Sequence, residues 1–345
     1  MNSLPSTSHS QQNLNEEQLD RLRKVCGEVE FHLKDQNVTH YRPIRTDLLS
    51  VLRNVRNRLN SEGVQLSGLY LVGGAASHVA VEAYKYADLD VLLSIASDPS
   101  LTEDGEKKIF GLIRKAIYEV LRELLIQTVG YAPHQSALID KEVLIRNTGS
   151  NEAWSLFSIH NKDGRNLELK SVMRMAREYQ FATDSLRIDL VPLMDQTEGG
   201  VAMYSYFEDI QEATRLLRGR LIDTIHQNRI FGGGLLKYCL LKLRGYRDNR
   251  TDYDARLNLW RDMATGFGSA WKMMRGRAML DSFLKNHFSP MDLDGKRGLL
   301  RNLAFFLQLM EEGVRVEVTR EMERLEKVLS EQCGLEPDPI GQHPK

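Results

Sequence analysis

The chain has 345 residues, of which 42% are hydrophobic and 27% charged, and this composition fits a globular protein large enough for two subdomains. The formal net charge is -1, which excludes binding of a polyanion through overall charge, so any attraction to an anionic partner must be local. The three cysteines, Cys26, Cys239 and Cys333, are too widely spaced for a disulfide framework or a zinc cluster and favour a reducing compartment.

The first two thirds of the chain mix helical and strand patterns. We expect disorder over 1–14, which lacks the apolar core of a signal peptide, and no apolar run is long enough to predict a membrane-spanning helix. Apolar spacing predicts the following helices: 16–34, a second from about 47 with Thr46 as N-cap, a short one after 73–74, and 102–127. The predicted strands are 66–72, 87–95, 154–159, 167–172 and 185–193.

The last third of the chain is predicted to be almost entirely helical. Helical periodicity runs from 204 to 330, with breaks at 232–234, 248–251 and 289–290. The predicted fold class is therefore α+β, with a mixed sheet and flanking helices followed by an all-helical domain. We expect the first domain over 15–198, the helical domain over 199–332 and a disordered tail over 333–345.

Two aspartates sit inside an apolar strand. Asp88 and Asp90 are two residues apart, so their carboxylates face the same side while Leu89 and Val91 point into the core. Two such carboxylates repel each other unless a cation lies between them, and Mg²⁺ is the cation that carboxylates suit. The alternative is a strand edge whose aspartates face water.

A glycine pair precedes these aspartates. Gly73 and Gly74 end the previous strand, where glycine lets a backbone approach a phosphate closely, and the following helix start favours anions. A strand, a glycine turn, a short helix and a strand with Asp-x-Asp is the layout of the nucleotidyltransferase (polymerase-β-like) fold. In that fold the turn holds a triphosphate and the aspartates hold two metal ions.

The layout requires a third carboxylate, for which two candidates exist. Glu168 lies between Leu167 and Leu169, and Asp189 lies between two apolar residues in the next strand. Residue type alone favours Asp189, because aspartate is the shorter and commoner ligand. The alternative for either acid is a solvated face or an arginine partner.

Six segments, in the same order along 16–325, resemble the terminal nucleotidyltransferase-five family of animals, which are template-independent cytoplasmic poly(A) polymerases: "AASHV", "YADLDVLL", "WSLFSIHNKDGRNLELKSV", "FATDSLRIDL", "FGGGLLKYCLLKLRGYR" and "FLKNHF". The resemblance implies that Asp88, Asp90 and Glu168 are the catalytic metal ligands, which leaves Asp189 a supporting role. It also implies that Lys237, in "GGGLLKYC", contacts the triphosphate.

The chain departs from the family pattern at the turn. The family has Gly-Ser where this chain has Gly73-Gly74, so one hydrogen bond to phosphate is missing, and we expect backbone amides and Ser77 to replace it. The loop before Asp88 is also short. A weakened or inactive enzyme that serves as an interaction protein is therefore an alternative, as is a nucleotide second-messenger synthase.

The helical domain carries a local positive charge. The segment 213–301 contains 18 Lys and Arg against 8 Asp and Glu, which suits an RNA backbone, although solvated helix faces are the alternative. The predicted function is therefore extension of RNA 3′ ends with adenosine from ATP, with Mg²⁺ or Mn²⁺, in the cytoplasm, with nuclear or endomembrane association as further options. The apolar helices at 299–312 and 316–330 pack internally or offer a groove to a protein partner.

Overall fold

The computed structural model describes residues 11–34, 43–96, 101–130, 135–147, 152–161, 165–174, 186–197, 199–205, 209–222, 234–249, 252–273 and 276–336. The chain divides into two compact units. The sheet unit comprises Met1–Glu178 and Asp184–Thr214, and the helical unit comprises Tyr179–Thr183 and Arg215–Lys345.

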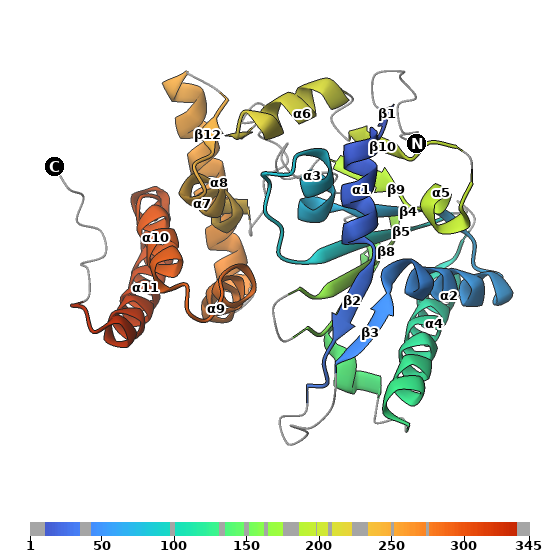
Figure 1. Cartoon of the computed structure of the whole chain (residues 1–345). Coiled ribbons are helices and arrows are strands. Elements are labelled where there is room, and N and C mark those ends of the chain that lie inside the picture. The colour runs from blue at the N-terminus through green and yellow to red at the C-terminus, as the bar shows by residue number, and fades with distance from the viewer. Residues whose placement is uncertain are drawn as a thin grey trace. The chain divides into compact units, whose positions relative to one another are not determined.

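One mixed sheet forms the centre of the sheet unit (Figure 1), as the sequence predicts. Its strands, in spatial order, are β1 (Gln11–Asn13), β10 (Ala202–Ser205), β9 (Leu186–Asp189), β4 (Leu66–Val72), β5 (Leu89–Ile95), β8 (Leu167–Arg174), β7 (Glu152–Ile159) and β6 (Ile139–Asn147). Neighbours in this sheet pair antiparallel, apart from β5 and β8, which are parallel. This parallel pair lies at the middle of the sheet, where both neighbours protect it.

Alternation of side chains fixes which face of the sheet is the core. In β5 and β8, every second residue is buried, starting with Leu89 and with Leu167, and the residues between them are half-buried. Each leucine buried in this way stabilises the fold by about 1.5–3 kcal/mol. A shift of one residue in either strand would turn these leucines out of the core, so the core holds the register.

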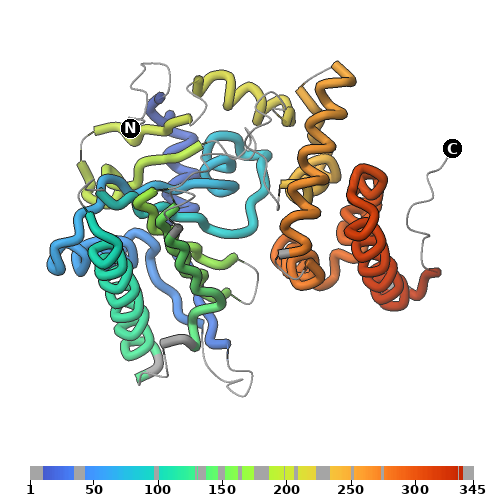
Figure 2. Tube along the Cα trace, turned by 180° about the vertical axis from the view of Figure 1, so that it is seen from behind, coloured from blue at the N-terminus to red at the C-terminus, as the bar shows by residue number. Residues whose placement is uncertain are grey.

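The helices of the sheet unit begin and end at recognisable residues. They are α1 (Glu16–Val25), α2 (Leu48–Ser61), α3 (Gly73–Ala80), α4 (Glu103–Val129) and α5 (Val191–Asp195). The Thr102 hydroxyl accepts a hydrogen bond from Gly105 N and caps α4, which ends at the left-handed Gly130. α1 packs on α3, which also contacts β4, β5 and β9 (Figure 1), and α4 runs along the outside of the unit beside α2 (Figure 2).

The structure corrects several predicted elements. The helix expected over 16–34 ends at Val25, because Glu28–Phe31 form β2, a strand of alternating burial that pairs with β3 (Ile44–Asp47). Asp47, rather than Thr46, caps α2 and accepts a hydrogen bond from Ser50 N at 2.7 Å. The last strand predicted in this region stops at Asp189, because Pro192 favours the first turn of α5.

The edges of the sheet were not predicted. β1 falls within the segment expected to be disordered, where Gln11–Asn13 pair with Ala202–Tyr204 of β10. Because β10 belongs to the sheet, the sheet unit continues past the boundary expected after residue 198. Residues 1–10 of the expected N-terminal tail and 337–345 of the expected C-terminal tail lie outside the described residues.

The helical unit packs around α7, α8 and α11. Its helices are α7 (Gly234–Leu243), α8 (Tyr253–Met273), α9 (Gly276–His287), α10 (Leu293–Ala304) and α11 (Glu312–Cys333), and α6 (Ile210–Arg218) runs into it from the sheet unit. The strands β11 (Leu221–Ile222) and β12 (Arg247–Asp248) pair in parallel and form a two-stranded ribbon. α7 packs against α8 and α10, and α11 packs against α8, α9 and α10. In the described parts of the chain, no helix has the length and apolar character needed to span a bilayer.

Candidate active site

The parallel pairing of β5 with β8 brings two acids together. Asp90 and Glu168 are direct partners in the register, with the buried pairs Leu89–Leu167 and Val91–Leu169 on either side. Because the leucines and valine face the core, both carboxylates emerge on the opposite face of the sheet. The core of the sheet unit therefore fixes the separation of these two acids.

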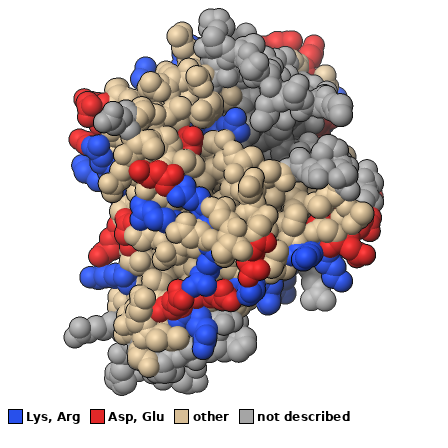
Figure 3. Space-filling view, turned by 90° about the vertical axis from the view of Figure 1, so that its right-hand side faces the viewer, with Lys and Arg blue, Asp and Glu red and all other residues tan. Residues whose placement is uncertain are grey.

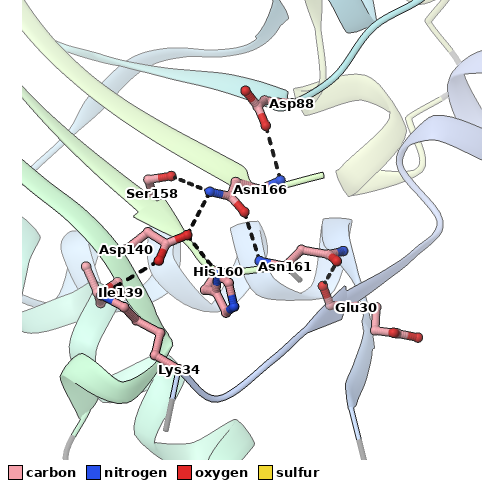
Figure 4. Close-up of polar contacts among 9 residues, drawn as sticks. All are labelled: Glu30, Lys34, Asp88, Ile139, Asp140, Ser158, His160, Asn161 and Asn166. Atoms are coloured by element: carbon pink, nitrogen blue, oxygen red, sulfur yellow. Dashed lines mark hydrogen bonds and ion pairs between the residues drawn. The ribbon is translucent and has the colours of Figure 1, made fainter. Parts of the chain in front are cut away.

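Asp88 is the residue immediately before β5. It lies two residues before Asp90, which is the spacing of side chains on one face of a strand. Its Oδ1 accepts a hydrogen bond from Asn166 N at 3.3 Å (Figure 4). Loss of hydration raises the pKa of Asp88 to about 7, the negative charges of Glu168 and Asp90 add to this rise, and Asn166 and Lys170 oppose it. The charged form of this carboxylate is thus costly in the folded protein, as expected for an acid that awaits a cation.

Asn166 connects the start of β8 to the neighbouring strands. Its side-chain Nδ2 donates to Asp140 Oδ2 at 3.0 Å and to Ser158 Oγ at 3.1 Å, and its Oδ1 accepts from Asn161 N at 2.8 Å (Figure 4). His160 shares the same Asp140 oxygen at 2.7 Å. This network holds the backbone amide that binds Asp88, and sequence reasoning did not detect it because its members come from separate strands and loops.

Lys170 is the cation of the site and was missed by the sequence prediction. It follows Glu168 by two residues, so its side chain leaves β8 on the face that carries the acids. Its Nζ donates to Asp90 Oδ1 at 2.5 Å and lies 3.5 Å from Glu168 Oε2. Burial lowers the pKa of Lys170, but the two carboxylates outweigh burial and the net shift is upward, so the ammonium stays charged.

Glu168 is the second carboxylate that Lys170 contacts. Burial raises its pKa, Lys170 lowers it and Asp90 raises it again, with a net upward shift. Burial and the neighbouring Asp90 thus make the charged form of Glu168 less favourable, and Lys170 offsets part of that cost.

The glycine turn lies against Asp90. Gly73 has a φ of 64°, in the left-handed region, and a Cβ at this position would lie 2.7 Å from Asp90 Oδ2. Only glycine combines this backbone conformation with this contact. At Gly74 a Cβ would lie 3.1 Å from Tyr86 Cβ, so the serine that the family pattern carries here would be crowded.

The remaining predicted residues occupy different surroundings. Ser77 is fully buried. Asp189 pairs with Tyr70 across β9 and β4, so one strand separates it from β5, and its Oδ1 accepts a hydrogen bond from Val191 N at 2.9 Å. Glu168 rather than Asp189 is thus the acid beside Asp90. Lys237 is half-buried on α7 in the helical unit, and Gly232 and Gly233, in the helix break expected at 232–234, lie outside the described residues.

The three carboxylates are the type of ligand that a divalent cation binds. Three carboxylates on one face supply the hard oxygen ligands that Mg²⁺ and Mn²⁺ take, and the raised pKa of Asp88 marks a carboxylate that lacks a counter-charge. As the described side chains stand, no group of three or more His, Cys, Asp or Glu is arranged to hold a metal, and Lys170 binds Asp90 directly. A cation at this site would therefore share or replace that contact.

The sequence of the chain is similar to that of known proteins. Residues 14–329 match the model of a family described as nucleotidyltransferase. Terminal nucleotidyltransferase 5C of Gallus gallus is 30% identical over 293 residues, which cover 80% of this chain and 72% of the relative. The Homo sapiens protein of the same name is 29% identical over the same shares, and terminal nucleotidyltransferase 5B of Bos taurus is 31% identical over 260 residues, which cover 70% of this chain and 58% of that relative.

Proposed function

The chain belongs to the terminal nucleotidyltransferase 5 family, and we propose that it extends RNA 3′ ends with adenosine from ATP. The family establishes that it is a nucleotidyltransferase, an enzyme class that uses a nucleoside triphosphate and a divalent metal. The observation that carries the finer proposal is the convergence of Asp90 and Glu168 in register, with Asp88 beside them.

In the proposed reaction, the RNA 3′-hydroxyl oxygen forms a bond to the α-phosphorus of ATP. The bond from that phosphorus to the bridging oxygen breaks, pyrophosphate leaves and the hydroxyl proton is released. Divalent ions held by Asp88, Asp90 and Glu168 would supply a Lewis acid for the attacking and leaving oxygens. The specificity for adenosine rests on the resemblance to poly(A) polymerases.

The chain's own residues have distinct tasks in this proposal. The leucines of β5 and β8 set the spacing of Asp90 and Glu168, so little reorganisation is required when substrate arrives. Gly73 keeps side-chain atoms away from Asp90, which leaves room for a phosphate oxygen. Lys237 would neutralise the leaving pyrophosphate, by its place in the family motif.

We also propose that the protein acts in the cytoplasm. Cys26 and Cys239 are free and buried, and burial raises the pKa of the Cys26 thiol to about 12. Such thiols are inert packing groups rather than partners in disulfides. They support a reducing compartment, in which an enzyme acting on messenger RNA would meet its substrate.

Product analysis tests the proposal. The purified chain is incubated with a labelled oligoadenylate primer, Mg²⁺ or Mn²⁺, and each of the four nucleoside triphosphates in turn. We expect a ladder of extended primers with ATP, and a loss of rate of at least about a hundredfold in the Asp88→Asn/Asp90→Asn variant. The matched variant Asp20→Asn/Asp104→Asn, which removes the same charge at exposed positions, should keep the parent's rate.

Two outcomes would overturn the proposal. The first is the absence of extension by the parent protein with every nucleotide, which would favour a non-catalytic interaction protein, as the crowded Gly74 position suggests. The second is a primer-independent product that contains only nucleotides, which would identify a second-messenger synthase.

A further inference from the structure

Four arginines of the helical unit gather where α6 and α7 end: Arg218, Arg220, Arg244 and Arg247, the arginine cluster. The ribbon of β11 and β12 brings them together, because Leu221 pairs with Arg247 and Arg247 N donates to Arg220 O at 2.8 Å. A Cβ on Gly245, the residue after Arg244, would lie 3.9 Å from Arg220 Nη1. Residues 24 or more positions apart in the sequence thus share one small surface.

The charge of the arginine cluster is not balanced within the described residues. Arg218, Arg220 and Arg247 are exposed, Arg244 is half-buried, and none of the four forms an ion pair with a described side chain. The nearby Asp248 does not compensate them. Its side chain is 4% exposed, and its oxygens accept a hydrogen bond from Tyr238 at 2.7 Å and bind Lys242 at 3.4 Å.

In the sheet unit, two half-buried arginines are paired with acids. Arg58 binds Glu119 and Glu123, and Arg56 binds Asp195. On the face of the molecule shown in Figure 3, acidic and basic side chains alternate without a large area of one sign. The arginine cluster is thus a local concentration of positive charge, among the described residues, in a chain whose net charge is -1.

The backbone at Arg220 adds an independent observation. Its φ is 50°, in the left-handed region, where the backbone of a non-glycine residue is strained. Glycine would occupy this position without strain, and glycine does stand at the neighbouring position 219. Arg220 is exposed, so packing does not account for an arginine at this strained position.

We propose that the arginine cluster binds the phosphate backbone of the single-stranded RNA that the enzyme extends. This inference rests on the proposed function. Guanidinium groups keep their charge at every physiological pH and bind phosphate oxygens through two parallel hydrogen bonds. Because phosphate contacts carry no sequence information, the arginine cluster would hold many RNAs alike. Each phosphate neutralised would also release counterions, which makes the binding dependent on salt.

The first test measures RNA affinity directly. Fluorescence anisotropy of a 5′-labelled oligoadenylate of about 15 nucleotides is followed with the full chain, without ATP, at salt concentrations from about 50 to 200 mM. We expect the Arg218→Gln/Arg220→Gln/Arg247→Gln variant to bind at least about tenfold more weakly, and its salt slope to fall by about 2. The control Arg261→Gln/Lys285→Gln/Lys327→Gln removes the same charge from exposed positions of the same unit and should stay within about twofold of the parent.

A second variant separates RNA binding from folding. Arg220→Gly removes one guanidinium and also relieves the left-handed strain, while glycine's extra freedom in the unfolded chain offsets that gain. We expect a melting temperature within about 3 °C of the parent, and RNA affinity at least about threefold weaker. A purely structural arginine would give the reverse, with unchanged affinity and an altered melting temperature.

The outcomes distinguish this inference from the proposed function. If the parent extends primers but the triple variant and Arg220→Gly bind RNA as tightly as the parent, the inference is wrong and the proposed function stands. If the parent extends no primer with any nucleotide, the proposed function fails, whatever the anisotropy shows. Binding of phosphatidylserine vesicles that is lost in the triple variant, with RNA affinity unchanged, would assign the arginine cluster to an acidic lipid surface and overturn the RNA assignment.

Discussion

At the scale of single residues, the site brings negatively charged side chains close together, and their mutual repulsion is unfavourable. Asp88, Asp90 and Glu168 lie on one face of the sheet, and burial raises the pKa of Asp88 and of Glu168. Lys170 provides one positive charge in return. One ammonium cannot balance three carboxylates, so the site is most stable either partly protonated or with a further cation.

Asp88 should make the metal-free protein less stable as pH rises. Its folded pKa of about 7 lies above the ordinary value of 3.8, so the folded state binds more protons than the unfolded state between these two values. Stability therefore falls with increasing pH across this window and levels off above it. The melting temperature of Asp88→Asn in a chelator should exceed the parent's at pH 8, and the gap should narrow towards pH 5. A gap that stays constant or widens on acidification would contradict this assignment.

Lys170→Met should destabilise the metal-free protein. Removal of the ammonium leaves Asp90 and Glu168 facing each other, and the loss is expected to be about 1–3 kcal/mol in urea unfolding at neutral pH, since the Lys170 side chain is 33% exposed. Lys141→Met, on the exposed β6, is the matched control and should change stability little. Added Mn²⁺ should narrow the difference between Lys170→Met and the parent. Equal stability of both variants without metal would show that Lys170 is not the counter-charge of the site.

The sequence singled out the three acids as candidate ligands, which remains a prediction, and it did not identify Lys170 as their counterion. Asp88, Asp90 and Glu168 stand out because acids within apolar strands are rare. Lys170 does not, because a lysine two residues after Glu168 gains meaning only once β8 is known to pair in parallel with β5. Residue type alone favoured Asp189 over Glu168, and the family resemblance reversed that preference; the strand order, which residue types do not reveal, places Glu168 beside Asp90.

At the scale of elements, the turn between β4 and α3 determines how closely anything can approach Asp90. Gly73→Ala should lower both stability and primer extension, because its methyl group would meet Asp90 Oδ2 at 2.7 Å in addition to the cost of a φ of 64°. Gly63→Ala is the control, since Gly63 has a φ of 78° but open space around a Cβ. We expect Gly73→Ala to cost at least about 1 kcal/mol more than Gly63→Ala in urea unfolding. Equal costs, with unimpaired extension, would contradict a steric role for Gly73.

The elements themselves were partly readable from the sequence. Long periodic segments such as α4, with Thr102 as its cap, appear where they were expected. The errors lie in short strands. The segment Glu28–Phe31 was predicted to end a helix because its apolar residues also fit the helical period of 3.6 residues per turn. It forms a strand because it pairs with β3, which lies farther along the chain. The nine-residue β6 was missed because Leu144 and its charged neighbours lack a buried face.

At the scale of the whole molecule, a sheet unit that gathers carboxylates is joined to a helical unit with local positive charge. The sequence predicts the two classes of unit from the change in periodicity. The boundary expected from the sequence, after residue 198, precedes β10. This strand is short, and it is recognisable as part of the sheet only through its pairing with β9. The near-neutral net charge conceals the arginine cluster, which forms only when the ends of α6 and α7 meet in the ribbon.

The most direct test of the whole account is a calorimetric titration of Mn²⁺ into the full chain with a non-hydrolysable ATP analogue. Asp90→Asn and Glu168→Gln should each weaken Mn²⁺ binding by at least about tenfold. Asp189→Asn, which keeps an oxygen to accept the hydrogen bond from Val191 N, should bind like the parent within about twofold. Unchanged binding in Glu168→Gln, or weakened binding in Asp189→Asn alone, would contradict the carboxylate site described for β5 and β8.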